Sequence, residues 1–469
     1  MKSTNNIKIL IIVTLLSLTS CQKVLDIDAP TNERPSGVVF GSDDNAKAAL
    51  SGAYSQLGGT QTYGSDLTLI TGLAADELKT SSPSVRYVQL QNNTYDAINN
   101  SLIRNAWEDS YTSLYRFNAI IAGLSSANGV TPAVAQQMLG EAKAMRAYIL
   151  MSLVSLYGDV PLILTTNVQE TATMPKTPAA QVWQQIITDL TEAKEELADA
   201  YVSNNGSAQR MQINKSGAAA LLAKAYLATG QWALAVSNAS EVISNTTLYG
   251  LLPGTQLSDV FLANSRESIL QLGSAFMGDT GYTGEGSIFI PSAFTSAMNF
   301  AIRDGLLNAF ENNDRRRDAW VRTYTLNGVT TNQPFKYQNV DRDAATASGR
   351  TESVMVIRLA EVYLVRAEAN ARLSNAGQAV ADLNVLRTRA GLAALPVTVN
   401  LLNAVEQERR VELFCERGDR WFTLKRNGNV NQVIGALKPQ TWTETAQLFP
   451  IPQTAIDANP NLIQNPGYR

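Results

Sequence analysis

One stretch of the sequence predicts a pair of antiparallel helices, and this pattern limits the fold more than any other feature. The alanine-rich segment 215–230 ends at Gly230, and glycine commonly ends a helix because it adopts a left-handed backbone conformation without strain. The following segment, 232–245, repeats apolar residues at three- and four-residue steps, which places them on one helix face. Ala223 and Ala235 lie twelve positions apart across the turn. Their small side chains allow the two helices to approach closely.

A second stretch has the same organisation. Segment 356–373 is followed by the turn sequence SNAG and then by segment 378–391. Here Ala367 and Ala379 are again twelve positions apart, a spacing that resembles the tetratricopeptide helical hairpin. Two hairpins fall short of the three or more that a free-standing array needs, so they must pack on other helices. Helical periodicity predicts these further helices at residues 43–57, 101–124, 140–161, 182–200 and 401–414.

Two long polar stretches, residues 58–100 and 272–350, separate the predicted helices. They are rich in Gly, Thr, Asn and Tyr. Such lengths are uncommon in a compact domain unless they are functional or contain short strands of their own. The sequence therefore predicts a mainly α fold, in which tetratricopeptide-like hairpins pack with additional helices beside an irregular, loop-rich lobe with short strands. We expect a ligand to bind in that lobe.

The amino terminus has the layout of a secretory signal. Lys2 and Lys8 are followed by an apolar run at residues 9–18. As a helix this run would rise about 15 Å, only about half of a hydrocarbon core near 30 Å. The sequence LTSC, which ends at Cys21, resembles the bacterial lipobox, in which the cysteine is acylated. An ordinary signal peptide followed by an unmodified cysteine is the alternative. The predicted division is a removed signal peptide at residues 1–20, a lipid-anchored tether at 21–40 and a single helical domain at 41–469.

Composition excludes several classes of function. The chain has 38 Lys and Arg against 41 Asp and Glu, so it lacks the basic excess that nucleic-acid binding requires. It contains no histidine. Most nucleophilic hydrolases and most zinc or copper sites depend on imidazole, so these classes of function are excluded. If Cys21 is acylated, Cys415 has no disulfide partner, and its apolar context predicts a buried structural thiol.

No cofactor is expected, because the sequence contains no P-loop, no dinucleotide fingerprint and no EF-hand loop. A calcium ion held by loop carboxylates remains open. Glycoside hydrolysis by two carboxylates also remains open, although no acidic residue stands in a context that singles it out.

Six segments together resemble the SusD/RagB-like nutrient-binding lipoproteins of the outer membrane. They are WEDSYTSLYRFN from Trp107, GEAKAMRAY from Gly140, RLAEVYLVRAEA from Arg358, LNVLRTRAG from Leu383, ERRVELFCERGDRWF from Glu408, and FPIP with QNPGY between Phe449 and Tyr468. With the lipobox, these blocks span nearly the whole chain. The resemblance implies an amino-terminal family part to about residue 260, and a carboxy-terminal part beyond it.

This resemblance implies a non-enzymatic protein at the cell surface that captures oligosaccharides, or sometimes peptides. It also implies a partner, a SusC-like TonB-dependent transporter barrel that takes up the captured nutrient. Most of the matched blocks are helical, and we interpret their charged residues as ion pairs between helices rather than as catalytic groups. These residues are Arg146, Arg358, Glu361, Glu368, Arg410, Glu412 and Arg420.

Candidate ligand contacts come from the two polar stretches, because a glycan usually binds on an exposed aromatic ring flanked by amides and carboxylates. The first stretch supplies Tyr63, Asp76, Tyr87, Asn92 and Tyr95, with Glu77, Arg86 and Asn93 beside them. The second supplies Tyr282, Phe289, Trp320, Tyr324 and Tyr337, together with Phe294 and Phe335. For each ring the alternative is packing in the core, and for Trp320 packing is the favoured interpretation.

Three other functions remain open from the sequence. The first is an exported glycosidase, and the second is a scaffold that binds only another protein through its hairpins. The third is a family member with a peptide ligand, for which the site would be deeper and less aromatic.

Overall fold

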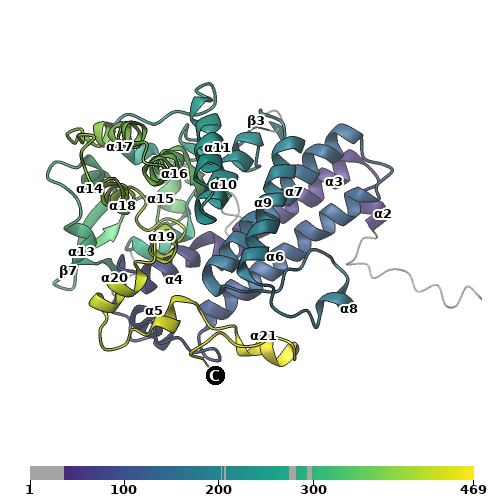
Figure 1. Cartoon of the computed structure of the whole chain (residues 1–469), viewed down its shortest axis with the longest axis horizontal. Coiled ribbons are helices and arrows are strands. Elements are labelled where there is room, and N and C mark those ends of the chain that lie inside the picture. Colours follow the sequence, from purple (N-terminus) through teal and green to yellow (C-terminus); the bar gives the residue numbers. More distant parts are fainter. Residues whose placement is uncertain (1–35, 202, 205–206, 274–280, 293–297, 469) are drawn as a thin grey trace, which may run out of the picture.

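The computed structural model describes residues 36–201, 203–204, 207–273, 281–292 and 298–468. The predicted signal peptide, Cys21, most of the predicted tether and Phe294 lie outside the described residues. Figure 1 shows long helices of the amino-terminal half on one side and most of the carboxy-terminal helices on the other.

Long helices build the amino-terminal half. They are α3 (Asp43–Gly59), α6 (Ser101–Ser125), α7 (Pro132–Tyr157) and α9 (Ala179–Glu196). Side-chain caps fix where two of them begin. Ser42 accepts a hydrogen bond from the Asn45 amide before α3, and Asn100 accepts one from the Ile103 amide before α6. The helices predicted at 43–57, 101–124, 140–161 and 182–200 are confirmed, although α7 begins eight residues earlier than expected, at Pro132.

Both helical hairpins are confirmed. The first comprises α10 (Lys215–Ala228) and α11 (Trp232–Ser244), and the second α16 (Leu359–Arg372) and α17 (Ala376–Ala390). All four alanines of the predicted pairs are fully buried. Gly230 has a φ of 75°, the left-handed conformation expected at the end of α10. The helices pack in the order α9, α10, α11, α16, α17, so the two hairpins continue an array that the amino-terminal helices begin.

The predicted start of the second hairpin is wrong. Residues 354–358 form the strand β8, and the helix begins only at Leu359. The β-branched residues Val354, Val356 and Ile357 favour the strand. β8 pairs with β4 (Ser268–Leu272) in the interior, where every residue of both strands is buried.

The other strands also form antiparallel pairs. β1 (Leu78–Thr80) pairs with β5 (Phe300–Ile302), β2 (Ser203–Asn204) with β3 (Ser207–Ala208), and β6 (Val321–Leu326) with β7 (Val329–Pro334). Asn327 and Gly328 join β6 to β7 with φ values of 52° and 77°, a pair of left-handed residues typical of a tight hairpin.

The stretch at residues 58–100 is more helical than expected. It contains the π-helical turn η2 (Thr62–Asp66), α4 (Leu67–Ala74) and α5 (Val85–Asn92), besides β1. α4 has the sequence LTLITGLA, and all eight of its residues are buried. Because α4 is buried on every side, its sequence lacks the periodicity that would distinguish a short helix from a buried strand.

Shorter elements complete the fold. Those before α18 are α2 (Ser36–Val39), α8 (Val168–Thr171), η3 (Leu257–Asp259), α12 (Gly284–Phe289), α13 (Asp304–Leu307), α14 (Arg315–Trp320) and α15 (Arg342–Ser348). Those from α18 onward are α18 (Leu401–Glu412), α19 (Asp419–Arg426), α20 (Val430–Leu437), η5 (Glu444–Gln447) and α21 (Gln453–Ala458). The predicted helix at 401–414 corresponds to α18. Within the described parts of the chain, no helix is both long and apolar enough to cross a bilayer.

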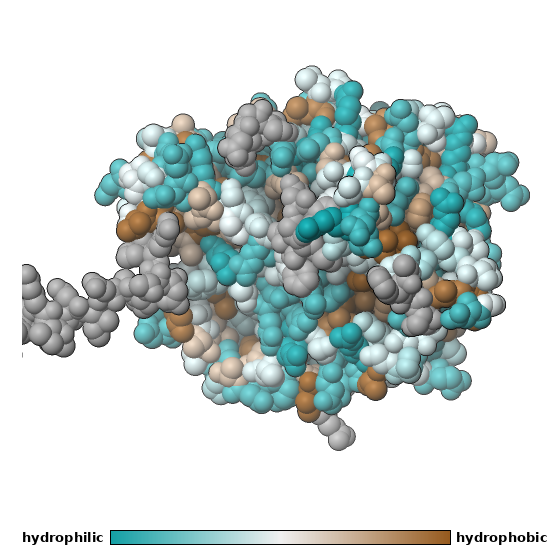
Figure 2. Space-filling view, turned by 180° about the vertical axis from the view of Figure 1, so that it is seen from behind, coloured by the Kyte–Doolittle hydropathy of each residue, from teal (hydrophilic) through white to brown (hydrophobic). Residues whose placement is uncertain are grey.

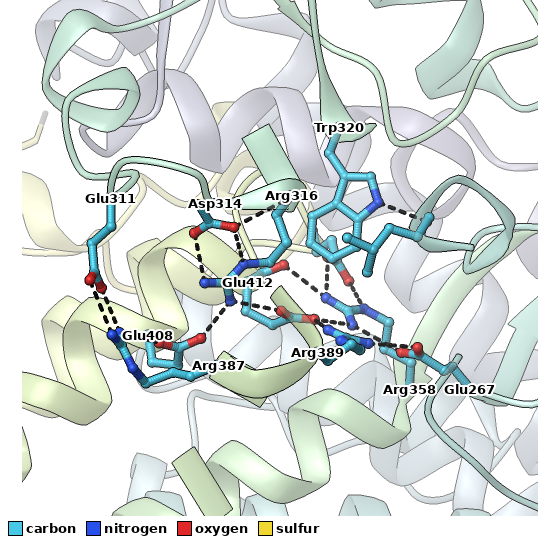
Figure 3. Close-up of polar contacts among 12 residues, drawn as sticks. Glu267, Glu311, Asp314, Arg316, Trp320, Arg358, Arg387, Arg389, Glu408 and Glu412 are labelled. Atoms are coloured by element: carbon cyan, nitrogen blue, oxygen red, sulfur yellow. Dashed lines mark hydrogen bonds and ion pairs between the residues drawn. The ribbon is translucent and has the colours of Figure 1, made fainter. Parts of the chain in front are cut away.

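A buried network of ion pairs connects distant parts of the carboxy-terminal half (Figure 3). Glu412 accepts hydrogen bonds from Arg316, Arg358 and Arg389, and Glu267 pairs with both Arg358 and Arg389. The opposite charges of the paired guanidinium and carboxylate groups offset much of the cost of burying them.

The expectation that the matched blocks contain structural ion pairs is confirmed. The pairs besides those of the network are Arg146 with Asp189, Glu361 with Lys224, Glu368 with Arg426, and Arg410 and Arg420 with Asp76. Cys415 is 3% exposed, which agrees with a structural thiol.

Candidate functional site

Three of the candidate aromatic residues contribute to the core through both ring and polar group. The Tyr63 hydroxyl lies 2.9 Å from Ser110 Oγ, and Trp320 Nε1 donates to the Leu257 carbonyl at 2.9 Å. Tyr337 accepts a hydrogen bond from the Met355 amide at 2.9 Å. Because each polar group has an internal partner, burial of the ring costs little. These three residues are buried. Their burial corrects the expectation that Tyr63 and Tyr337 contact a ligand, and it agrees with the packing favoured for Trp320.

Two more rings are corrected in the same way. Tyr95 and Phe289 are buried, and their centroids lie 4.8 Å from Phe449 and 6.4 Å from Phe300. Both contacts are edge-to-face, the geometry that aromatic pairs favour in cores.

Asp76 is also a structural residue rather than a ligand contact. It lies between Arg410 and Arg420, with ion-pair distances of 2.8 Å to each, so its oxygens are already engaged. Its neighbour Glu77 is 2% exposed, and burial raises the Glu77 pKa to about 8. Glu77 accepts a hydrogen bond from the Cys415 amide at 3.0 Å.

Helix α5 carries candidates that remain accessible. Tyr87 and Asn92 are half-buried and Arg86 is exposed. The Tyr87 ring packs edge-on against Phe300 of β5 at 4.9 Å. Arg86 lies over the same ring at 4.7 Å and donates to the Tyr87 hydroxyl at 2.8 Å. α5 therefore presents an aromatic ring that is held in place by a guanidinium group.

An open pocket of about 480 Å³ lies at the carboxyl end of α5. We call it the α5 pocket, and Figure 1 shows α5 beside α20 near one edge of the molecule. It is lined by Lys79, Thr80, Gln91, Asn92, Arg303, Leu437, Lys438, Pro439, Gln440 and Thr441. Most of these side chains offer hydrogen-bond donors or acceptors, so the pocket suits a hydroxyl-rich ligand.

Local hydrogen bonds position the walls of the α5 pocket. Gln91 Oε1 accepts from the Thr80 amide at 2.7 Å, which connects α5 to β1. Asn93 ends α5 in the left-handed conformation, with a φ of 55°. Lys438 Nζ donates to Asn93 Oδ1 at 2.7 Å and to the Leu73 and Ala74 carbonyls. Three acceptors around one amine fix the floor of the pocket.

Charge at the α5 pocket is basic. Lys79 pairs with Asp304 at 3.1 Å in an exposed position, whereas Arg303 donates through Nε to the Leu78 carbonyl at 2.8 Å. The lining contains no carboxylate, and none of the described residues forms a cluster suited to a metal ion. The lining therefore offers a ligand hydrogen bonds and positive charge.

The remaining candidates lie elsewhere in the irregular lobe. Tyr282 and Tyr324 are half-buried, and neither lines the α5 pocket. Tyr324 lies on β6 of the β6–β7 hairpin. Phe335 lines a separate open pocket of about 380 Å³, where Arg322 lies over its ring at 4.5 Å.

Sequence reasoning missed most of the α5 pocket. Gln440 and Thr441 follow α20, far from α5 in sequence, and only the fold brings them together. Lys79 and Arg303 lie inside the predicted ligand-binding stretches, but they are neither aromatic nor amide residues and were not among the candidate ligand contacts. Figure 2, the view from behind that of Figure 1, shows that on this face apolar residues lie in small groups among polar ones.

Comparisons with known proteins agree with this fold. A model described as the SusD family matches residues 194–468, which is more than half of the chain. A second model, described as starch-binding associating with outer membrane, matches residues 50–227. SusD-like protein P2 of Formosa agariphila is 27% identical, over 98% of this chain and 99% of that protein.

Solved structures show the same architecture. A SusD superfamily protein from Bacteroides thetaiotaomicron superposes with a TM-score of 0.79 at 23% identity, covering 91% of this chain and 100% of the other. Surface glycan-binding protein A from Bacteroides uniformis superposes with a TM-score of 0.77 at 23% identity, covering 90% and 99%.

Proposed function

The chain belongs to the SusD family, and from this premise we propose that it binds oligosaccharides at the cell surface and passes them to a TonB-dependent transporter. The α5 pocket is the observation that carries the proposal. It combines an open shape with amide, hydroxyl and basic side chains beside the half-buried ring of Tyr87. A structural relative named for surface glycan binding supports the choice of ligand class.

The ligand is an oligomer rather than a single sugar. A hexose has about twelve heavy atoms, and at roughly 0.3 kcal/mol per atom it contributes about 3–4 kcal/mol, which corresponds to millimolar affinity. Useful capture therefore requires several sugar units on neighbouring parts of the irregular lobe. Asn92 and Gln91 contact one unit in the α5 pocket, and Tyr87 offers a platform for the next.

Cys21 is the proposed lipid attachment point, and the residues between it and α2 (Ser36–Val39) are the proposed tether that holds the domain at the outer membrane, since Phe40 is already buried in the domain. Metabolic labelling with a fatty-acid analogue should modify the wild-type protein and leave Cys21→Ala unlabelled. Co-purification of a transporter barrel with the lipidated protein tests the proposed partner. Labelling of Cys21→Ala, or recovery without a barrel under conditions that preserve membrane complexes, would contradict the respective part of the proposal.

Calorimetry with a panel of oligosaccharides of increasing length tests the binding function. We expect affinity to rise with chain length and Asn92→Ala and Tyr87→Ala each to weaken binding at least fivefold. Tyr324→Ala is the matched control, because this tyrosine is half-buried but lies on the β6–β7 hairpin. If Tyr324→Ala weakens binding and the α5 variants do not, the hairpin is the site and the α5 proposal fails.

The same incubations distinguish a binding protein from an enzyme. Recovery of intact oligosaccharide supports a non-enzymatic function, whereas a ladder of shorter products would identify a glycosidase. Binding of peptides in place of every glycan in the panel would identify the peptide-capturing alternative.

A further inference from the structure

A second cavity lies apart from the α5 pocket, between the helical array and the carboxy-terminal segment. This central pocket has a volume of about 320 Å³, at the lower end of the range for small-molecule sites, roughly 300–1,000 Å³. Its walls come from α7, α9, α10, β8 and the segment that contains α19. Figure 1 shows α19 between α9 on one side and α18 on the other.

The walls of the central pocket are largely apolar. Met151 of α7, Trp183 of α9, Leu221 of α10 and Phe422 of α19 all line it. Met151, Trp183 and Phe422 are only half-buried, so the apolar wall is in contact with solvent through the pocket. Covering this wall with an apolar ligand would be favourable, because it removes apolar surface from water.

The three carboxylates of the central pocket are already neutralised. They pair as Glu361 with Lys224 at 2.6 Å, Asp419 with Arg409 at 2.8 Å, and Glu416 with Arg358 at 2.8 Å. Arg426, a further basic residue of the lining, pairs with Glu368 outside it.

Two basic residues of the lining have only neutral acceptors. Lys425 Nζ donates to the Ser155 carbonyl at 2.5 Å. Arg417 donates to the Tyr63 carbonyl at 2.5 Å and to the Tyr148 hydroxyl at 2.6 Å. Neither forms an ion pair with any carboxylate in the described ranges. The pocket therefore has a positive potential without a matching negative group, and an enclosed apolar wall strengthens such a potential.

We propose that the central pocket binds a small amphipathic monocarboxylate, with its apolar part against Met151 and Trp183 and its carboxylate at Lys425. Both cations are half-buried. Lys425 donates to one neutral acceptor, which leaves two N–H groups of its protonated amine for a carboxylate, and Arg417 adds to the attraction from its own position. A sugar unit fits poorly, because several of its hydroxyl groups would face the apolar wall without hydrogen-bond partners. This site does not depend on glycan binding and lies outside the α5 pocket.

Calorimetry with octanoate, octanol and octylamine as probes tests the proposal. The three share an apolar chain and differ in head group, so they separate the charge requirement from apolar burial. We expect one octanoate per protein, with an affinity at least tenfold higher than that of octanol, and no heat from octylamine. Equal affinities for octanoate and octanol, or no octanoate binding at millimolar concentration, would overturn the proposal.

Variants locate the site. Lys425→Met should reduce octanoate affinity to that of octanol, whereas Lys47→Met, which removes an exposed lysine of α3, should leave it unchanged. Met151→Trp should fill the pocket and weaken both probes at least tenfold. Octanoate binding that survives Lys425→Met or Met151→Trp, or that falls equally in Lys47→Met, would show that the central pocket is not the site. Oligosaccharide binding measured on the same variants reports on the α5 pocket separately.

Discussion

Arg358 and Glu412 form an ion pair of 2.7 Å in which neither side chain is more than 1% exposed. Arg358 ends the strand β8, and Glu412 ends the helix α18. The pair thus connects the interior sheet to the helix that packs against the second hairpin. Glu412 also accepts from Arg316 at 3.0 Å and from Arg389, so three guanidinium groups share this one carboxylate.

Glu412→Gln should therefore be strongly destabilising. The variant leaves buried arginines without their shared negative charge, and removal of one partner from such a pair typically costs about 3–5 kcal/mol. Denaturant unfolding followed by circular dichroism measures the loss.

A surface pair provides the control for Glu412. Arg104 and Glu108 lie 3.9 Å apart on the exposed side of α6, where such a pair contributes only about 0.3–0.5 kcal/mol. Arg104→Ala should change stability by less than about 1 kcal/mol. A loss for Glu412→Gln that is no larger than the loss for Arg104→Ala would contradict the structural importance of the buried network.

Much of the helical architecture could be predicted because its signals are local. Ala223, Ala235 and Gly230 lie within one hairpin, and their spacing is visible in the sequence alone. The burial of Tyr63 and Trp320 depends instead on Ser110 and Leu257, which are distant in sequence. A tyrosine or tryptophan in a polar stretch has the same local signal whether its polar group meets water or a remote partner.

The α5 pocket was predictable only in part for the same reason. Asn92 is an amide near tyrosines in the sequence, but Gln440, which lines the same pocket, lies far from it in sequence, in the carboxy-terminal half.

The strand at residues 354–358 was not predicted, because its apolar run leads directly into the helical pattern of α16. Periodicity does not separate a short buried strand from the start of a helix.

Glu77 should make stability depend on pH. Its folded-state pKa is raised to about 8 by burial, against about 4.3 in an unfolded chain. Between these values the folded state holds a proton that the unfolded state releases, so the contribution of Glu77 to stability falls as pH rises. Glu77→Gln keeps an oxygen acceptor for the Cys415 amide and cannot ionise. Its stability should decline less than wild type between about pH 5 and 8 in denaturant titrations, and parallel declines would exclude Glu77 as a contributor.

Two glycines on neighbouring helices should respond oppositely to alanine. A Cβ at Gly123 of α6 would lie 1.9 Å from Cε2 of Phe40, whereas one at Gly52 of α3 meets nothing within 4 Å. Gly52→Ala should stabilise the protein by about 0.5–1 kcal/mol, because alanine favours the helix. Gly123→Ala should destabilise it by about 1–3 kcal/mol through overpacking against Phe40. Thermal unfolding of both variants checks the pair, and stabilisation by Gly123→Ala would show that Phe40 does not pack on α6.

Lys425→Met should stabilise the protein at neutral pH in the absence of any ligand. Burial lowers the pKa of Lys425 to about 7, whereas a lysine in the unfolded chain titrates near 10.4. Between about pH 7 and 10.4 the unfolded state binds more protons than the folded state, so wild-type stability rises with pH across this window.

Below about pH 7 the cost of burying the charged amine of Lys425 is fully present. Methionine removes that cost, so Lys425→Met should be more stable than wild type near pH 7, and this gain should disappear as the pH approaches 10.4. Denaturant unfolding at several pH values measures this difference, with Lys47→Met as the exposed control expected to show none. A gain that is independent of pH would mean that apolar packing of the methionine, rather than loss of the buried charge, is responsible.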